Sequence, residues 1–448
     1  MWSKLISPML YRVIVNNYKS FGEEQQFDMF PNMRRDNFPQ HVYKQGRLPV
    51  LKECAIYGAN GSGKSNFIEL FYFLQTFITK DVFDAQRLQD WYATNCFRLP
   101  VAEGNQPIEI MLEYGIGGAI FIYVLKIVST GIQEEALYRS GIGKEDNRLI
   151  FSRAYADVKF EISINEDIKN LLVRQILANP AATVLGLNGR LHLLDFEVLN
   201  KSYLWFENNL IVVPVSRDIP WLIELFVSNP ELMDFVNSIY MEIGLGIDSL
   251  SIQETDINEW FENNKNEKDI LNLMYQGDIS QHNISKIKDT IPAYSVLKQK
   301  GGKQVVLEFI FQQLGKDGYK GEMKVTDQST GTCRLLTLLP AIYDALSREC
   351  TVFVDEIDNG IHPMLVRKLV EYFGKKPSSG QLIYTTHETA LLDQQNLLRA
   401  DEVWLTEKVQ GCTKMYSLNI FKIHKTISIQ NGYLEGRYGA IPFLGTLK

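Results

Sequence analysis

The stretch Gly58-Ala-Asn-Gly-Ser-Gly-Lys-Ser65 decides the fold of this 448-residue chain. It matches the pattern G-x-x-x-x-G-K-[ST] without departure. The glycines let backbone N–H groups turn toward phosphate oxygens, and the N-terminus of a following helix favours the same negative charge. An apolar run precedes the loop at residues 55–57, and apolar residues at helical spacing follow it over residues 66–83. The stretch therefore predicts a strand–loop–helix unit that binds a nucleoside triphosphate.

Each residue type in this loop has a chemical reason. Lys64 is expected to place its ammonium on the β- and γ-phosphates, and the Ser65 hydroxyl to ligate Mg²⁺. A glycine-rich turn without a ligand is the alternative, and a chance match to the whole pattern is expected at a few per cent at most. The predicted nucleotide-binding residues are Gly58, Asn60, Gly61, Gly63, Lys64, Ser65 and Asn66.

A second stretch, Thr351-Val-Phe-Val-Asp-Glu-Ile-Asp358, is an apolar strand that ends in acids. Such a strand beside a phosphate loop would deliver Asp355 to the Mg²⁺, directly or through water. Glu356, one residue further on, is placed to orient or deprotonate the attacking water. An Asp-Glu pair alone is a weak signal, because acids often end strands at solvent. Together with a complete phosphate loop, it predicts a metal ligand and a catalytic carboxylate.

Two further segments carry polar groups suited to a γ-phosphate. Asp327-Gln-Ser-Thr-Gly-Thr-Cys-Arg334 opens a predicted helix with hydroxyl and amide donors, although Ser and Thr are also favoured there as simple helix caps. Gln381-Leu-Ile-Tyr-Thr-Thr-His-Glu388 presents His387 just beyond another apolar strand. A lone histidine is more often structural. At a strand end beside these motifs, His387 is a candidate contact for the γ-phosphate or the attacking water.

Composition limits the protein class. Apolar residues make up 45% and charged residues 22% of the chain, as in ordinary globular proteins of about two to four domains. The net charge of −7 gives no general electrostatic footprint for nucleic acid. Five scattered cysteines without a Cys-x-x-Cys pair favour a reducing, cytoplasmic compartment. The most apolar stretch, residues 114–125, is shorter than the roughly 20 residues of a membrane span, so no membrane partner is expected.

Periodicity predicts the course of the chain. Strands are expected around residues 11–21, 50–57, 108–128, 139–160 and 304–325, and helices around residues 168–177, 193–209 and 221–241. From Cys333 onward strand and helix alternate, which predicts βαβ units and a parallel sheet. No heptad run occurs, so the long segment between the phosphate loop and the second half of the motifs is not a coiled coil.

The order of the four motifs resembles the ABC-type ATPase heads of the SMC, RecF and OLD (overcoming-lysogenization-defect) families. It is still more similar to the bacterial AAA-type ATP-binding proteins grouped with OLD-like ATPases. The resemblance covers residues 10–160 and 300–445. Beyond the motifs it rests on Val15-Asn-Asn-Tyr-Lys-Ser-Phe21, Leu398-Arg-Ala-Asp-Glu-Val-Trp-Leu-Thr-Glu-Lys408 and Tyr433-Leu-Glu-Gly-Arg-Tyr-Gly-Ala-Ile-Pro442.

The resemblance implies an α/β fold: an ABC-type P-loop ATPase head of mixed sheets and flanking helices, with an inserted, mainly helical domain. It implies an N-terminal lobe at 1–165, the insertion at 166–295 and a C-terminal lobe at 296–448. Ser329, Gly331 and Thr332 would be the signature motif, although Cys333 departs from the charged or polar residue expected there. Asp358 and the residues to His362 would form the loop that crosses a dimer interface, and His387 would be the switch histidine.

In such proteins the signature helix of one subunit closes over ATP and Mg²⁺ held by the other, which implies a homodimer or higher homo-oligomer. The function that the resemblance favours is an ATP-hydrolysing regulatory subunit of an anti-phage defence system, as in Septu, PARIS and some retron systems. It would control a separately encoded nuclease or toxin effector.

Three alternatives remain. A RecF- or SMC-like DNA-repair ATPase would clamp duplex DNA, and the lysine-rich stretch 265–303 is the candidate contact for nucleic acid or an acidic protein. An OLD-type nuclease would need a Toprim domain, but no Asp-x-Asp occurs after His387. An interaction protein with a vestigial site is disfavoured by intact motif side chains.

Overall fold

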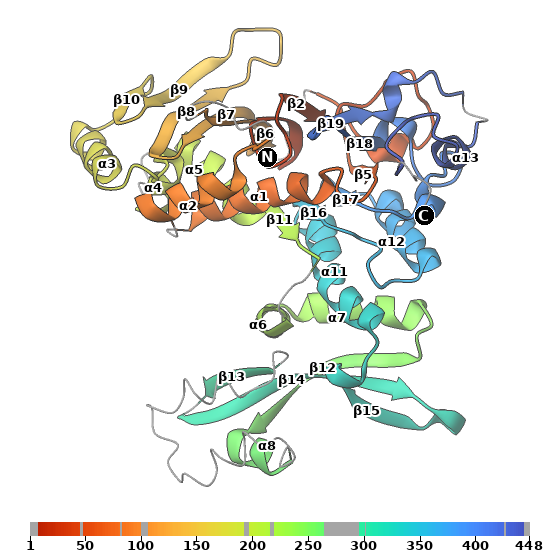
Figure 1. Ribbon diagram of the computed structural model, residues 1–448. Helices are drawn as coiled ribbons and strands as arrows, with labels where there is room; N and C mark the ends of the chain where they lie inside the picture. The colour runs from red at the N-terminus through yellow and green to blue at the C-terminus, as the bar shows by residue number, and fades with distance from the viewer. Residues whose placement is uncertain are drawn as a thin grey trace. The chain divides into compact units, whose positions relative to one another are not determined.

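The computed structural model describes residues 8–44, 48–80, 83–99, 106–191, 197–215, 219–263, 295–300, 302–424 and 427–442. The chain forms two compact units (Figure 1). The first comprises Met1–Val215, Asp344–Asp358 and Pro363–Lys448, and the second comprises Ser216–Tyr343 and Asn359–His362. Three stretches of the sequence therefore build the first unit.

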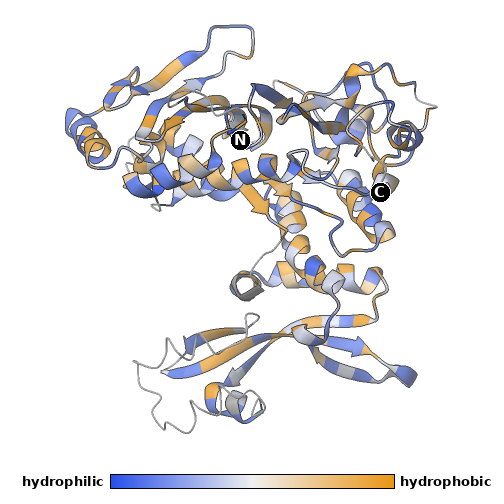
Figure 2. Ribbon diagram, viewed as in Figure 1, coloured by the Kyte–Doolittle hydropathy of each residue, from blue (hydrophilic) through white to orange (hydrophobic). Residues whose placement is uncertain are grey.

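A six-stranded sheet in the first unit organises the predicted site. Its strand order is β11-β16-β17-β5-β18-β19, and all neighbouring strands run parallel except the last pair. The strands are β5 (Glu53–Gly58), β11 (Leu210–Val213), β16 (Thr351–Val354), β17 (Gln381–Thr385), β18 (Val403–Val409) and β19 (Cys412–Ser417). Figure 2 shows β11 as hydrophobic along its length, as the strands of a sheet covered on both faces should be.

Helices pack on this sheet through apolar and aromatic side chains. Helix α1 (Lys64–Thr79) is the next element after β5 and buries eight apolar side chains in the core. The ring of Phe71 on α1 stacks on that of Phe353 in β16, with centroids 3.8 Å apart and planes at 20°. The other helices of the unit are α2 (Ala85–Asn95), α3 (Glu166–Ala178), α4 (Val184–Arg190), α5 (Glu197–Leu204), α12 (Pro363–Lys375) and α13 (Ile429–Leu434).

A seven-stranded antiparallel sheet completes the core of the first unit, with the order β10-β9-β8-β7-β6-β1-β2. Its strands are β1 (Leu10–Asn16), β2 (Gln25–Asp28), β6 (Ile108–Ile116), β7 (Ala119–Val128), β8 (Gly131–Arg139), β9 (Arg148–Ala154) and β10 (Asp157–Phe160). A separate short pair joins β3 (Val42–Tyr43) and β4 (Val50–Leu51). Both sheets contribute to one apolar core, as buried Leu112 of β6 and Phe353 of β16 illustrate.

The second unit combines a four-stranded antiparallel sheet with helices. In this sheet β14 pairs with β12, β13 and β15. The elements are α6 (Ile219–Ser228), α7 (Pro230–Glu242), β12 (Ile247–Asp256), α8 (Ile257–Asn263), β13 (Ser295–Lys300), β14 (Lys303–Leu314), β15 (Lys320–Lys324) and most of α11 (Thr330–Ser347). The indole of Trp260 donates a 2.7 Å hydrogen bond to buried Glu308, which fastens α8 to the sheet.

The α/β fold class, with mixed sheets and flanking helices, is confirmed. The compact units divide the chain at positions other than the predicted boundaries at 165 and 295. Strand β11 pairs with β16, so residues up to Val215 belong to the first unit despite their helical sequence pattern. The second unit is not purely helical. Residues 247–256 form strand β12, which pairs with β14 in an antiparallel sheet.

None of the helices in the described part of the chain combines the length and the apolar character needed to cross a bilayer.

Candidate functional site

The phosphate loop connects β5 to α1 at the carboxyl edge of the six-stranded sheet. Two of its glycines have no room for a side chain. A Cβ at Gly58 would lie 2.3 Å from the carbonyl oxygen of Thr406, and one at Gly63 would lie 2.2 Å from the Thr413 hydroxyl oxygen. Gly63 also has a φ of 110°, which L residues rarely adopt. The glycines that the motif requires are thus needed by the packing of this loop.

Lys64 begins α1 and lies across the loop. Its ammonium donates hydrogen bonds to the carbonyl oxygens of Gly58 (2.9 Å) and Ala59 (3.2 Å), and the residue is 6% exposed. Burial lowers the pKa of Lys64 to about 8, although the carboxylates of Asp355 and Glu356 act in the opposite direction. The cation is therefore surrounded by acceptors and carries a proton at neutral pH.

Hydroxyl groups from distant segments brace the loop. The hydroxyl of Thr413 in β19 donates a 2.7 Å hydrogen bond to the carbonyl oxygen of Ser62, and its oxygen lies 2.7 Å from the hydroxyl of Ser20. The amide of Asn66 donates to the same Ser20 hydroxyl at 2.7 Å. The Ser62 hydroxyl bonds that of Thr406 at 2.7 Å. The sequence motif gave no indication of Thr406 or Thr413. Thr406 reaches the loop because β18 pairs with β5, and Thr413 reaches it from β19, which pairs with β18.

The carboxylate strand β16 ends beside this loop. Asp355 is buried, and its Oδ1 accepts a 2.6 Å hydrogen bond from the Thr385 hydroxyl. The backbone N–H of Glu356 donates to the same hydroxyl oxygen at 2.7 Å. Glu356 has a φ of 46°, a strained conformation for a residue with a side chain. Strain of this kind clusters at functional sites, and here the Thr385 contacts hold it in place.

His387 and Asp358 lie at the next positions along this edge. The backbone N–H of His387 lies 3.4 Å from Oδ2 of Asp358, and the imidazole is partly exposed. Partial burial and the Lys64 ammonium lower the pKa of His387, against the opposing effect of Asp358 and its neighbours. The imidazole is therefore neutral at pH 7 and can either accept or donate a proton.

The register of the sheet explains why these groups converge. Strand β17 lies between β16 and β5, so residues that follow three parallel strands meet at one edge. Figure 1 shows the orange-red β5 beside later strands drawn in blue. The structure thus brings Lys64, Asp355, Glu356, Asp358 and His387 into one electrostatically coupled group. Ser65 stands in the first turn of α1, and Asn60 and Gly61 form the exposed part of the loop.

The predicted signature residues lie in the second unit. Ser329 precedes α11, where its hydroxyl oxygen accepts a 3.2 Å hydrogen bond from the N–H of Thr332 and lies 3.0 Å from the Thr332 hydroxyl. A Cβ at Gly331 would lie 2.5 Å from the carbonyl oxygen of Gly360. Ser329 is therefore a helix cap in this structure, and Gly331 allows residues 359–362 to pack against the start of α11.

The donor groups of the first unit fit ATP and Mg²⁺. Successive N–H groups at the N-terminus of a 16-residue helix, together with the Lys64 ammonium, match a polyphosphate. A serine hydroxyl and a buried carboxylate, Ser65 and Asp355, are the oxygen donors that Mg²⁺ prefers. A surface pocket of about 360 Å³ lies beside the loop, and Lys19, Ser20 and Asn66 are among its lining residues.

The lysine-rich stretch falls mostly outside the described residues, which resume at residue 295. Two of its described lysines are paired with acids: Lys298 lies 3.6 Å from Glu224, and Lys300 lies 2.8 Å from Glu254. These two cations are therefore partly neutralised within the second unit.

Comparison with known proteins gives one family and several structures. The family model described as "AAA domain, putative AbiEii toxin, Type IV TA system" matches residues 54–393, about three quarters of the chain. No curated protein sequence matches the chain.

Three of the similar solved structures are SMC heads. An SMC head bound to the C-winged helix domain of ScpA has a TM-score of 0.44 and 12% sequence identity, covering 95% of this chain and 100% of that chain. The SMC head domain from Thermotoga maritima has a TM-score of 0.38 and 11% identity, covering 91% of this chain and 98% of that chain. A Pyrococcus furiosus SMC head with an extended coiled coil, bound to the C-terminal domain of ScpA, has a TM-score of 0.41 and 12% identity, covering 96% of this chain and 99% of that chain.

Proposed function

Because the chain belongs to the AAA-domain family whose description also names a putative AbiEii toxin and a type IV TA system, we propose that it is an ATP-hydrolysing regulatory subunit. In this proposal it acts as an ABC-type dimer of an anti-phage defence system. ATP binding and hydrolysis control a separately encoded nuclease or toxin effector. The mention of toxin systems in the family description supports this reading over a housekeeping role.

One observation carries the enzymatic part of the proposal. The phosphate loop, the Asp355–Glu356 pair and His387 follow three adjacent parallel strands and so share one edge of the sheet. An ATPase needs a polyphosphate cradle, a metal ligand and a group that positions water, all fixed before the reaction. Here the cradle follows β5, the metal ligand Asp355 and the water-positioning Glu356 both follow β16, and His387 follows β17.

The roles of the side chains follow from their surroundings. Lys64 and the α1 N-terminus would hold the phosphates, and Mg²⁺, when bound to Ser65 and Asp355, would neutralise charge on the β- and γ-oxygens. Asp355 cannot rotate freely, because the Thr385 hydroxyl holds its Oδ1. Glu356 would orient the attacking water and accept its proton. Neutral His387 would donate or accept a hydrogen bond at the γ-phosphate.

The dimer is supported by the division of functional groups between the two units. The Ser329 end of α11 is solvent-exposed, and it carries a hydroxyl and free helical N–H positions of the kind that bind a phosphate. Residues 359–362, which follow Asp358 in the chain, pack against Gly331 at this same helix start. A closing dimer would place this surface over the nucleotide of the partner subunit.

The experiment has an enzymatic arm and a partner arm. Purified wild-type protein should hydrolyse ATP in the presence of Mg²⁺. The Glu356→Gln variant should bind ATP without hydrolysing it quickly, and its mass by light scattering should then shift to that of a dimer or larger. Affinity purification from the native host, with ATP present, should recover the product of an adjacent nuclease or toxin gene. Absence of hydrolysis by the dimer would refute the enzymatic assignment. Salt-sensitive binding of duplex DNA without an effector would instead support the RecF-like alternative.

A further inference from the structure

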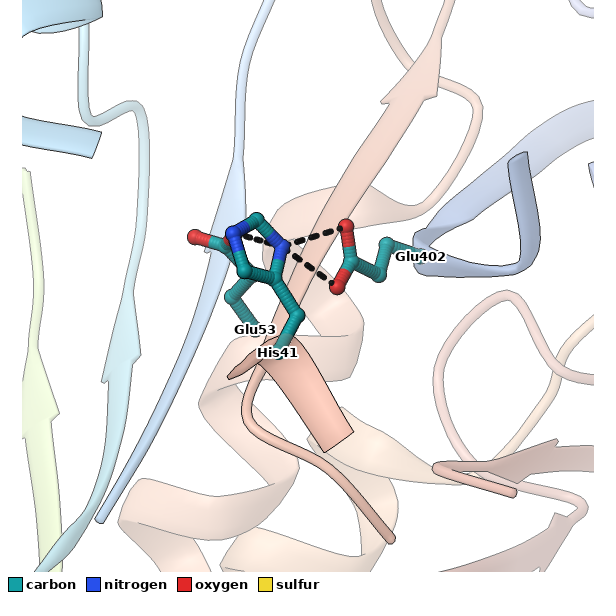
Figure 3. A group of neighbouring side chains, drawn as sticks. All are labelled: His41, Glu53 and Glu402. Carbon is teal, nitrogen blue, oxygen red and sulfur yellow. Dashed lines mark hydrogen bonds and ion pairs between the residues drawn. The ribbon is translucent and has the colours of Figure 1, made fainter. Parts of the chain in front are cut away.

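A second group of chemically reactive side chains lies at the other end of the phosphate-loop strand. His41 ends a short 3-10 helix (Pro39–His41), Glu53 is the first residue of β5, and Glu402 ends another 3-10 helix (Ala400–Glu402) just before β18. Figure 3 shows the imidazole of His41 between the two carboxyl groups. Since β5 spans six residues, this group lies about 17 Å from the phosphate loop along the strand.

The three side chains converge on one atom. Nδ1 of His41 lies 2.7 Å from Oε1 of Glu53, and it lies 3.0 and 3.2 Å from the two carboxylate oxygens of Glu402. His41 is 3% exposed, Glu53 is 1% exposed and Glu402 is fully buried. One donor atom from each of the three residues can be chosen so that all lie within 4.8 Å of one another.

One imidazole nitrogen serves both carboxylates of this group. Oε1 of Glu53 pairs with Nδ1 of His41, the same nitrogen that contacts Glu402, and no further hydrogen bond reaches the buried carboxylate oxygens of Glu53 among the described residues. Two carboxylates out of water need a compensating cation, because burial of an unpaired charge is costly. Buried Lys52 lies nearby in the sequence, but its ammonium donates to the carbonyl oxygen of Lys376 at 3.1 Å.

We propose that His41, Glu53 and Glu402 bind a divalent transition-metal ion, with Zn²⁺ as the best match to one imidazole and two carboxylates. Ligand atoms each about 2.1 Å from such an ion, at tetrahedral or octahedral angles, are about 3.0–3.4 Å apart. The observed separations of 2.7–3.2 Å from Nδ1 need only small side-chain adjustments to reach this geometry. A protonated His41 imidazole offsets the charge of only one of the two carboxylates, and the ion, bound in place of that proton, would supply the second positive charge.

The surroundings indicate a structural rather than a catalytic metal. A Cβ at Gly374, in the last turn of α12, would lie 2.7 Å from Nε2 of His41 and 3.0 Å from Oε1 of Glu53, so the helix backbone closes the site. Oε2 of Glu402 also accepts a 2.7 Å hydrogen bond from the N–H of Arg399. Hydrogen bonds of this kind orient the carboxylates that bind a metal. The ion would fasten the starts of β5 and β18 to the segment that carries His41.

Zinc and cobalt titrations of the full chain test the proposal. Protein stripped with a chelator should take up about one Zn²⁺ per chain by calorimetry, and its melting temperature should rise. Co²⁺ should give d–d absorption bands at the same stoichiometry. Glu53→Gln and Glu402→Gln keep the side-chain shape and should each lower Zn²⁺ affinity at least tenfold. Glu407→Gln, a carboxylate change further along β18, should leave the affinity unchanged.

Two controls keep the outcome decisive. Asp355→Asn should retain the uptake of one ion, which separates this site from the predicted Mg²⁺ site. Circular dichroism checks that each variant is folded, and His41→Gln gives a further way to remove a ligand if Glu53→Gln is unstable. The proposal is overturned if folded, stripped wild-type protein takes up no stoichiometric Zn²⁺ or Co²⁺. It is equally overturned if the uptake is unchanged in all three ligand variants, and the cluster is then an imidazolium held between carboxylates.

Discussion

The hydroxyl of Thr385 donates a 2.6 Å hydrogen bond to Oδ1 of Asp355 and accepts one of 2.7 Å from the N–H of Glu356. One side chain on β17 therefore sets both the rotamer of the predicted metal ligand and the backbone position of the predicted catalytic carboxylate. The residue itself has no chemistry to perform in ATP hydrolysis. Its contribution is to hold two neighbouring groups in a fixed and, for Glu356, strained geometry.

Thr385→Val tests this positioning role. The substitution keeps the shape of the side chain and removes the hydroxyl, so Asp355 loses its partner while the strand stays packed. ATP turnover should fall about 10- to 100-fold, the usual effect of losing a group that orients a metal ligand. Steady-state kinetics at varied Mg²⁺ should show a raised Mg²⁺ requirement.

Thr386→Val is the matched control for this change. Its hydroxyl oxygen accepts a hydrogen bond from the N–H of Glu388, two residues further along the chain. Turnover in this variant should change much less than in Thr385→Val. Equal losses in the two variants would mean that general strand packing, and not the contact with Asp355, is responsible.

Lys64→Ala removes the cation of the phosphate loop. Hydrogen bonds to charged groups contribute about 1.5–3 kcal/mol, so ATP affinity should fall roughly 10- to 150-fold. The fold should be retained, because the Lys64 ammonium donates its hydrogen bonds to carbonyl oxygens of its own loop. Calorimetric titration with a non-hydrolysable ATP analogue measures the change, and unchanged affinity would contradict the assignment of the phosphate loop.

The lowered pKa of Lys64 also predicts a pH dependence. Burial brings this pKa to about 8, so the free protein loses the ammonium proton as the pH rises through 8. Bound phosphate favours the charged form, and ATP affinity should therefore weaken about tenfold between pH 7 and pH 9. Lys64→Arg keeps its charge over this range and should show a flat profile. A flat profile in the wild type would show that another group provides the charge.

The sequence predicted the parts of the site that sit in one continuous motif. The loop at 58–65, Asp355 and His387 were identified because each follows an apolar strand with characteristic neighbours. Thr413 and Ser20 could not be found in this way, since their contacts at the loop join segments nearly 400 residues apart in the sequence. The extent of the first unit depends on a similar long-range contact, because four residues of β11 at 210–213 join its six-stranded sheet. Local periodicity cannot report which sheet such a short strand will join.

Glu356→Gln separates binding from hydrolysis. The amide keeps the size of the side chain and loses the charge that would orient the water and accept its proton. Turnover should fall about 100-fold or more, the range that general-base catalysis contributes, while ATP affinity stays within a factor of a few. Single-turnover measurements should show slow chemistry with ATP retained. Wild-type turnover would remove Glu356 from this role and leave Asp355 as a metal ligand only.

The shared active site is tested by mixing two inactive variants. Ser329→Arg should block closure of the α11 surface over a partner's nucleotide, and ATP should still bind at Lys64 of the same chain. Lys64→Ala should fail to bind ATP but keep an intact α11 surface. In a heterodimer of the two, both lesions fall in one composite site, and the other site is native.

Turnover should therefore recover partly in the mixture although each parent is nearly inactive, because hydrolysis needs positioned donors on both sides of the transferred phosphoryl group. At equal amounts with free exchange, about half of the dimers are mixed and each has one native site, so up to about a quarter of wild-type turnover is expected if the sites act independently. Subunit exchange is measured separately with fluorescently labelled chains. If exchange is complete and no mixing ratio restores activity, Ser329 is only the helix cap that its hydrogen bond to Thr332 describes, and each chain hydrolyses ATP alone.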